Sequence, residues 1–271
     1  MEINTLKINI ERIWEDRNLL SENVDSINEV IELLDKGEIR VAEPENNDWQ
    51  INGWIKKAIL LYFASQKMKT HEVGIFEFYD KIPLKKNFEK LGVRVVPHAI
   101  SRYGSFLAKG VIMMPSYVNI GAFVDENSMV DTWTTVGSCA QIGKNVHLSG
   151  GVGVGGVLEP LQANPVIIED NCFIGSRCII VEGVRICKEA VLGANVVITA
   201  STKIIDVSES EPIEYKGIVP ERSVVIPGSI PKKFNAGTYN VNCALIIGKR
   251  KESTDKKTSL NNALRNFNVS I

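Results

Sequence analysis

Residues 130–151 read "VDTWTTVGSCAQIGKNVHLSGG", and an aliphatic side chain returns at every sixth position of this stretch. The period extends to both sides, and a small or compact residue stands four places after each aliphatic one. The aliphatic series, counted from Ile112, is Val118, Val124, Val130, Val136, Ile142, Leu148 and Val154. The compact series is Ser116, Ala122, Ser128, Thr134, Ala140, Val146 and Val152. Each hexad therefore has two positions that we expect to point inward.

A second series of hexads begins in a new phase at Ile168. Its aliphatic members are Ile168, Ile174, Ile180, Ile186, Leu192, Ile198 and Ile204, and its compact members are Cys172, Cys178, Val184, Ala190, Val196 and Thr202. Glycine and asparagine recur between the inward positions, as at Gly143 and Asn145, where the chain must turn and a left-handed backbone is needed. Short strands joined by tight corners predict a parallel β-helix over residues 94–230, with three hexads to a coil and about five to six coils.

The change of phase predicts a loop. Fourteen residues separate Val154 from Ile168, which is two more than two hexads, so the segment 155–167 must leave the regular coil. Loops that interrupt a rigid scaffold are a preferred place for function.

The flanking segments have different patterns. Residues 1–93 carry helical periodicity and predict a small, mostly helical domain; its apolar faces are Ile27, Val30, Ile31 and Leu34, ending at Gly37, and Ile51, Trp54, Ile55, Ala58 and Tyr62. Residues 231–271 hold a strand-like run, "YNVNCALIIGKR", and an amphipathic piece, "SLNNALRNFNV", which we expect to form a C-terminal cap. The fold class is therefore mainly β with an α-rich N-terminal domain.

Composition restricts the partners and the compartment. The net charge of -1, from 31 basic and 32 acidic side chains, provides no field that would attract nucleic acid or an anionic membrane. The first residues mix acidic and apolar side chains, so we expect neither a signal peptide nor a membrane span, and a cytoplasmic location. Five cysteines without ligand spacing and only three histidines argue against a disulfide framework and a zinc site.

A family resemblance rests on "RVVP" (94–97), "MPSYVNIGAFVDENSMVDTWTTVGSCAQIGKNVHLSGGVGVGGVLEPLQANP" (114–165) and "IIEDNCFIGSR" (167–177), with weaker support from "LLDKGEIRVAE" and "WIKKAILL". The chain resembles the tetrahydrodipicolinate N-succinyltransferases of lysine and diaminopimelate biosynthesis, within the hexapeptide-repeat acyltransferases. The resemblance implies a left-handed β-helix and a homotrimer with active sites between neighbouring β-helices. It also implies succinyl-CoA as co-substrate, with no permanently bound cofactor.

The resemblance implies roles for three residues. Arg94 would bind a carboxylate of the acceptor; the alternative is a solvated arginine at a domain junction. Asp131 would bind substrate and act as the base, since attack on a thioester needs a neutral amine; the alternative is that it only satisfies turn amides, as we expect for Asp125. Trp133 is an aromatic at a corner, where a ligand or partner would be expected to cover it.

Further residues are weaker candidates. Arg177 and Lys203 are outward cations that could bind the succinyl carboxylate or the phosphates of CoA, and they are equally well explained as surface charges. Gly155 and Gly156 belong to a glycine-rich run, "LSGGVGVGG", that permits close approach by the CoA arm or a neighbouring subunit. Glu182 is a candidate substrate contact. An acidic residue found in some family members is replaced here by Ile179, which leaves a second acid or base unassigned.

The predicted mechanism is direct transfer in a ternary complex, with Asp131 deprotonating the amine and backbone N–H groups stabilising the oxyanion. Cys139 has no assigned histidine base, so no acyl-enzyme is expected, and we expect His147 at a corner or interface. Two alternatives stay open: transfer of acetyl from acetyl-CoA to the same acceptor or to a sugar, and a non-catalytic β-helical scaffold.

Overall fold

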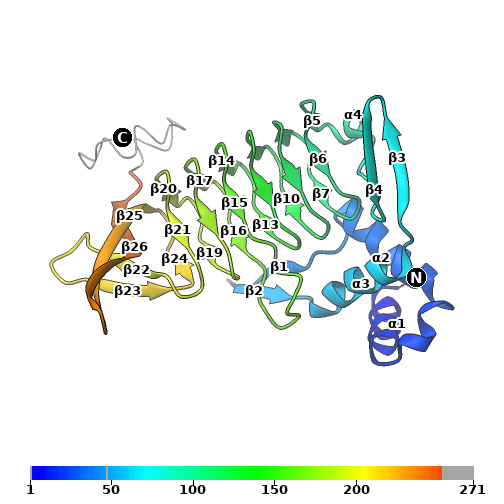
Figure 1. Cartoon of the computed structure of the whole chain (residues 1–271), viewed down its shortest axis with the longest axis horizontal. Coiled ribbons are helices and arrows are strands. Elements are labelled where there is room, and N and C mark those ends of the chain that lie inside the picture. The colour runs from blue at the N-terminus through cyan, green and yellow to red at the C-terminus, as the bar shows by residue number, and fades with distance from the viewer. Residues whose placement is uncertain (1, 47, 252–271) are drawn as a thin grey trace.

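The structure is a computed structural model that describes residues 2–46 and 48–251. The molecule is elongated, with helices at one end, a stack of coils in the middle and a long β-hairpin at the other end (Figure 1). The predicted amphipathic piece "SLNNALRNFNV" lies outside the described residues. No helix in the described ranges is long and apolar enough to cross a membrane.

Three helices form the N-terminal core: α1 (Ile3–Glu15), α2 (Val24–Lys36) and α3 (Gly53–Ser65), with a short 3₁₀ turn, η1 (Arg17–Leu20). The predicted face of α2 is buried, and the helix ends at Gly37, whose φ of 73° is left-handed. The N-terminal core continues into the coils, because Ile120 and Cys139 pack within it.

Two β-hairpins in this part were not predicted. Strands β1 (Ala42–Glu45) and β2 (Asp48–Ile51) form the first, and β3 (Lys69–Val73) and β4 (Phe76–Asp80) the second, followed by α4 (Phe88–Leu91). The assignment of Ile51 to a helix was wrong. Ile51 pairs with Ala42, and the helix starts only after Asn52, whose N–H donates to the carbonyl of Val41.

The coils consist of two-residue strands that visit three parallel sheets in turn. The first sheet contains β5 (Arg94–Val95), β8 (Ile112–Met113), β11 (Met129–Val130), β14 (His147–Leu148), β17 (Phe173–Ile174) and β20 (Val191–Leu192). The second contains β6 (Ile100–Ser101), β9 (Tyr117–Val118), β12 (Thr135–Val136), β15 (Gly153–Val154), β18 (Ile179–Ile180) and β21 (Val197–Ile198). The third contains β7 (Phe106–Leu107), β10 (Phe123–Val124), β13 (Gln141–Ile142), β16 (Ile167–Ile168), β19 (Arg185–Ile186) and β24 (Ile218–Val219).

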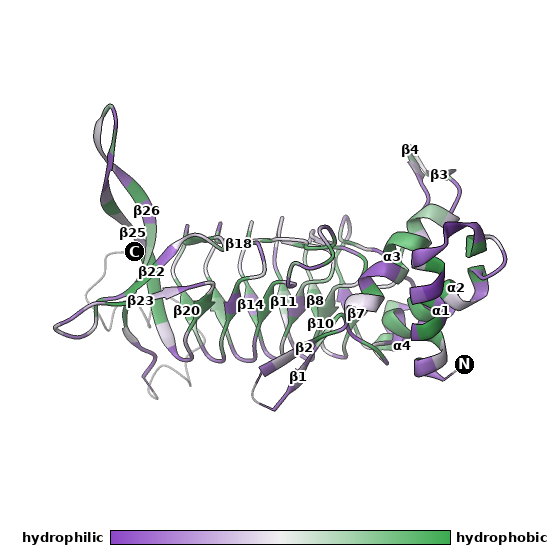
Figure 2. Cartoon of the chain, turned by 90° about the horizontal axis from the view of Figure 1, so that it is seen from below, coloured by the Kyte–Doolittle hydropathy of each residue, from purple (hydrophilic) through white to green (hydrophobic). Residues whose placement is uncertain are grey.

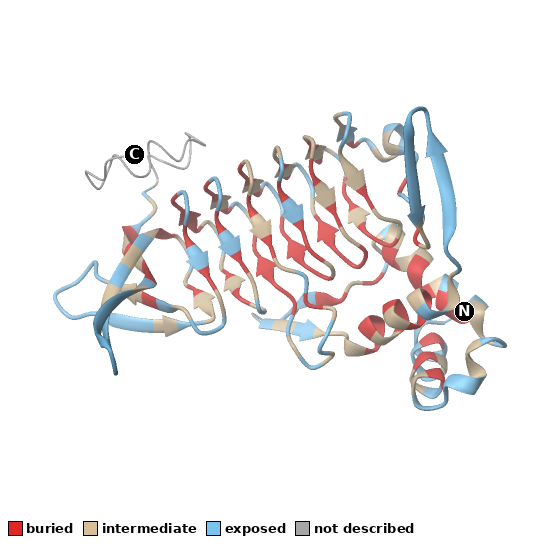
Figure 3. Cartoon of the chain, viewed as in Figure 1, coloured by how far each residue is buried: buried red, intermediate tan, exposed pale blue. Residues whose placement is uncertain are grey.

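Three hexads make one coil, as predicted. Val130, for example, pairs with Leu148, one coil further along the chain. The inward positions of both series are buried apart from Ile112 and Thr202 (Figure 3), and Cys172 and Cys178 fill the core as expected, with exposures of 1% and 0%. Asn127, Asn145, Asn171 and Asn195 all have the positive φ expected at corners.

The start of the first series was wrong by one residue. Met113, not Ile112, points inward, and it is paired with Val95 and Val130. Both residues are apolar. The step from Met113 to Val118 is one residue shorter than a hexad, so the six-residue period selected Ile112 instead. The interrupting loop runs from 155 to 166, because Ile167 already belongs to β16.

The regular coils are interrupted after β21 and resume at β24 and the first residues of β25. Strand β22 (Lys203–Asp206) pairs with β23 (Ile213–Lys216) and with β26 (Gly237–Lys249). These strands extend the first sheet beyond β20, and we call this extension the C-terminal sheet. Ile204 is buried but belongs to the extension and not to a coil, and Thr202 is only half-buried. The boundary at 230/231 falls inside β25 (Ser223–Phe234), which pairs with β20 and then continues as a hairpin with β26 (Figure 2). The run "YNVNCALIIGKR" is a strand, as predicted.

The outer face of the third sheet is covered by the β1–β2 hairpin and by Arg40, which precedes it. Arg40 Nε donates to Gln141 Oε1 at 3.1 Å, and Trp49 Nε1 donates to Glu169 Oε1 at 3.0 Å. The buried Glu169 carboxylate also accepts from Arg185 Nε at 2.7 Å and from the Lys188 N–H at 3.0 Å. This network fixes the N-terminal domain on the coils.

Candidate active-site edge

Corners between the first and second sheets stack into an edge that we call the Asp131 edge, defined by residues 131–134, 149–152 and 175–178. Backbone hydrogen bonds join the corners: Gly151 N–H to Thr132 O at 2.8 Å, and Arg177 N–H to Gly150 O at 3.1 Å. Successive coils of a parallel sheet lie roughly 4.8 Å apart. The edge therefore presents side chains from three consecutive coils at fixed spacing.

Asp131 begins the first of these corners. Its Oδ1 accepts the Thr132 N–H at 2.7 Å and the Thr132 hydroxyl at 3.2 Å. Asp131 therefore does satisfy a turn amide, which is the alternative to a catalytic role. It uses only one carboxylate oxygen, and Oδ2 has no hydrogen-bond partner in the described part of the chain. The half-buried carboxylate can stabilise its turn and still accept a proton.

Trp133 is the least favourable residue of this corner. Its φ is 60°, a conformation that costs a bulky side chain roughly 1–2 kcal/mol, and its side chain is 69% exposed. The backbone bond from its N–H to Pro115 O, at 2.6 Å, holds this geometry. Asparagine, which tolerates this backbone conformation, occupies the corresponding corner position at 127 and 145. The turn itself therefore does not require an indole, which instead provides an exposed apolar surface.

Two arginines border the edge without partners. Arg177 is exposed, and its side chain lies over Gly151, where an added Cβ would come within 2.7 Å of Arg177 Cδ. Arg94 is exposed in β5, two coils from Asp131 in the other direction, or about 10 Å of rise. Neither guanidinium has a hydrogen bond or ion pair within residues 2–46 and 48–251. Both are available to bind anionic groups of a ligand.

His147 lies on strand β14 and not at a corner. Its ring stacks on Phe173, with centroids 4.9 Å apart and planes at 3°. Burial lowers the pKa of His147, and the nearby Asp131 carboxylate opposes this shift. Since the first effect is larger, the pKa of His147 lies below its usual value.

The remaining candidates lie elsewhere. Glu182 is at a corner between the second and third sheets, where its Oε2 accepts the Ala200 N–H at 3.1 Å. Gly156 lies at the same edge and packs on the preceding coil, since an added Cβ would be 2.6 Å from Ser138 N; Gly155 packs similarly on Val181. Lys203 forms an ion pair with Glu214, at 2.7 Å, in the C-terminal sheet. Ile179 points outward from β18 and is 36% exposed.

Lys56 is a residue that the sequence analysis missed. It lies in α3, its side chain is completely buried, and its Nζ donates to three carbonyls of the 155–166 loop: Pro160, Leu161 and Ala163, at 3.3, 3.0 and 2.8 Å. Burial lowers the pKa of Lys56. A lysine between Ile55 and Ala58 on an apolar helix was the only signal. The contact joins "WIKKAILL" to "LEPLQANP", two of the segments on which the family resemblance rests.

The cysteines are placed as packing residues. Burial raises the pKa of Cys139 and Cys178 to about 12 and also raises that of Cys172. We expect these thiols to resist a disulfide reagent at pH 8 in the folded protein and to react at once in denaturant, because the thiolate is the reactive form. Half-buried Cys187, with a pKa raised to about 11, should react first. Rapid modification of Cys139 in the folded protein would contradict the placement.

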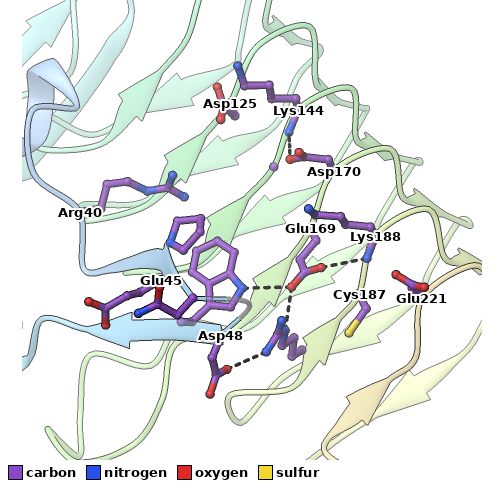
Figure 4. A pocket seen from close by; sticks show the side chains of 15 residues that line it. Arg40, Glu45, Asp48, Asp125, Lys144, Glu169, Asp170, Cys187, Lys188 and Glu221 are labelled. Atoms are coloured by element: carbon purple, nitrogen blue, oxygen red, sulfur yellow. Dashed lines mark hydrogen bonds and ion pairs between the residues drawn. The ribbon is translucent and has the colours of Figure 1, made fainter.

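No group of three or more His, Cys, Asp or Glu side chains is placed to hold a metal ion among the described residues. A cavity of about 610 Å³ lies away from the Asp131 edge, between the β1–β2 hairpin and the corners that join the third sheet to the first (Figure 4). None of the predicted site residues lines it.

Comparisons with known proteins agree with the sequence pattern. Residues 5–64 match a family model described as the N-terminal part of tetrahydrodipicolinate N-succinyltransferase, and residues 165–200 match the hexapeptide repeat of succinyl-transferase. The 2,3,4,5-tetrahydropyridine-2,6-dicarboxylate N-succinyltransferase of Acinetobacter baylyi is 55% identical over 89% of each chain. The enzymes of that name from Dechloromonas aromatica and Sodalis glossinidius are 52% and 49% identical, over 96% and 97% of this chain and 98% and 99% of theirs.

The hexapeptide coils, the matched hexapeptide repeat and these relatives define the class as a hexapeptide-repeat acyltransferase. Within that class, the chain belongs to the 2,3,4,5-tetrahydropyridine-2,6-dicarboxylate N-succinyltransferase family. The predicted family and the prediction of an enzyme are both confirmed.

Proposed function

We propose that the chain transfers succinyl from succinyl-CoA to the amino group of ring-opened tetrahydrodipicolinate at the Asp131 edge. The observation that carries this proposal is the Asp131 carboxylate, with one oxygen in its turn and the other available, between two unpaired guanidinium groups. The acceptor carries two carboxylates and the succinyl group a third, which is the charge pattern that Arg94 and Arg177 would bind.

The reaction proceeds by direct transfer. Asp131 takes a proton from the acceptor ammonium, and the neutral nitrogen attacks the thioester carbonyl. Backbone N–H groups stabilise the oxyanion that forms. The C–S bond then breaks, the nitrogen loses its second proton as the amide forms, and the departing CoA thiolate takes up that proton. Trp133 provides an apolar surface beside the reacting groups.

The assembly would complete the site. We propose that the coils wind left-handed and that three copies associate in the cytoplasm, so that the second-sheet side of one subunit faces the Asp131 edge of the next. Glu182, Gly155 and Gly156 lie on that side and would then approach the site from the neighbour. Lys203 is compensated by Glu214, which makes it the weakest candidate for binding CoA.

The release of free CoA thiol tests the function. The protein is mixed with tetrahydrodipicolinate, or with 2-aminopimelate as a stable analogue, and supplied with succinyl-CoA or acetyl-CoA in parallel. We expect acceptor-dependent release from succinyl-CoA, at least tenfold faster than from acetyl-CoA, because only succinyl offers a carboxylate to a cation. Faster release from acetyl-CoA would mean that acetyl-CoA is the donor. No acceptor-dependent release from either would contradict the enzymatic role.

A further inference from the structure

The cavity beneath the β1–β2 hairpin is separate from the Asp131 edge. Its coil side is made by corners that enter the first sheet, whereas Asp131 lies at corners that leave it. Figure 4 shows Arg40 and Asp48 on the hairpin side, facing Lys144, Asp170 and Lys188 on the coil side. The two sites would therefore be occupied independently.

The walls of the cavity are built before any ligand arrives. Buried Glu169 accepts hydrogen bonds from Trp49, Arg185 and the Lys188 N–H, and Arg185 also pairs with Asp48 at 2.9 Å. Hairpin and coils are thus connected through satisfied polar contacts. A preformed cavity does not have to order its walls when a ligand binds.

Arg40 is the exception in this network. Its Nε donates to Gln141, and its guanidinium stacks on Phe123 with 3.6 Å from Cζ to the ring centroid, but no carboxylate lies within ion-pair distance of it in the described ranges. Asp125, Glu43 and Asp170 are close enough to oppose the effect of burial, which lowers the pKa of Arg40 to about 10. The terminal N–H groups of Arg40 have no protein acceptor among the described residues. A fixed, planar donor of this kind suits a carboxylate.

The other charged side chains of the cavity limit the kind of ligand that could supply a carboxylate to Arg40. Six carboxylates line the cavity against four cations. Asp125 and Asp170 each use one oxygen to accept a backbone N–H, from Glu126 and Lys144 at 2.8 Å, which leaves their second oxygens for a ligand. A dianion would be repelled by these groups, and a simple diamine would leave Arg40 unpaired. The complementary ligand carries one carboxylate and an excess of ammonium groups.

We propose that this cavity is a second binding site, for a small basic α-amino acid whose carboxylate pairs with Arg40 and whose ammonium groups pair with Asp125 and Asp170. The volume of about 610 Å³ is ample for such a molecule. Its binding would also strengthen the contact between the N-terminal domain and the coils, because Arg40 belongs to one and the two aspartates belong to the other.

Calorimetric titration of the full chain tests the site with three probes of similar length. L-Lysine carries the complete charge pattern, 1,5-diaminopentane lacks the carboxylate, and 6-aminohexanoate lacks the α-ammonium group. We expect L-lysine to bind at least tenfold more tightly than either of the other two. Absence of L-lysine binding, or equal binding of 1,5-diaminopentane, would overturn the proposal.

Substitutions test whether L-lysine binds in the Arg40 cavity. Arg40→Gln should weaken L-lysine binding at least tenfold, whereas Arg17→Gln should not, because Arg17 stacks on Trp14 outside the cavity. Arg94→Gln should retain L-lysine binding; loss in Arg94→Gln with retention in Arg40→Gln would assign the ligand to the Asp131 edge and overturn the proposal. If Arg40→Gln does not fold, Asp170→Asn serves instead, since the amide oxygen can still accept the Lys144 N–H while the charge is removed. Unchanged affinity in that variant would also overturn it.

Discussion

Replacement of Asp131 by Asn is expected to lower kcat by roughly 10²- to 10⁴-fold with little change in KM, which is the usual contribution of a positioned general base. The substitution separates the two roles of the side chain. An amide oxygen can still accept the Thr132 N–H that Oδ1 accepts at 2.7 Å, but it cannot take a proton from the acceptor. Asn119 already makes the same contact at another corner, with its Oδ1 2.9 Å from the Ile120 nitrogen.

The control for this variant is Asp206→Asn. Asp206 also accepts a nearby backbone N–H, from Ser208 at 3.0 Å, but lies in the C-terminal sheet. We expect Asp206→Asn to keep full activity and both variants to retain a free energy of unfolding within about 0.5 kcal/mol of the parent. If Asp131→Asn retained more than a tenth of the parent kcat, another group would have to be the base.

Replacement of Lys56 by Met is expected to reduce the free energy of unfolding by about 2–4 kcal/mol. Three carbonyls of the 155–166 loop lose the ammonium group that they share, and a thioether cannot replace it. The loop can partly recover these hydrogen bonds by moving toward water, which limits the loss. Urea denaturation measures the change, and limited proteolysis should show faster cleavage within the loop.

The neighbouring Lys57 provides a matched control. It carries the same side chain on the same helix, but it pairs with Glu11 where both are partly exposed. Lys57→Met should therefore cost less than about 1 kcal/mol and should leave the loop resistant to protease. Equal losses from the two substitutions would mean that the loop does not depend on Lys56.

The coils could be predicted because each hexad repeats the same two requirements, one aliphatic and one compact inward residue. Where two neighbouring residues met the first requirement, as at Ile112 and Met113, the period could not choose between them. The C-terminal sheet was not foreseen because Ile204 satisfies the hexad pattern while β22 pairs with β26. Periodicity predicts which side chains are buried, but it does not predict which strand pairs with which.

The candidate site was predictable only in part. Asp131 and Trp133 are visible because they replace the glycine and asparagine typical of a corner. Arg40 and Lys56 act through contacts with residues 101 and 107 positions away, at Gln141 and Ala163, and no local pattern records such pairs. A sequence also does not show that Lys203 pairs with Glu214, or that the Glu182 carboxylate accepts the Ala200 N–H.

The most direct test of the account is a crystal structure with CoA and 2-aminopimelate bound together. We predict that the amino nitrogen of 2-aminopimelate lies within about 3.2 Å of the Asp131 carboxylate, the distance required for proton transfer. We also predict that Arg94 contacts a carboxylate of the same molecule. An amino nitrogen placed away from Asp131, whether at the Arg40 cavity or on another edge of the coils, would contradict the proposed active site.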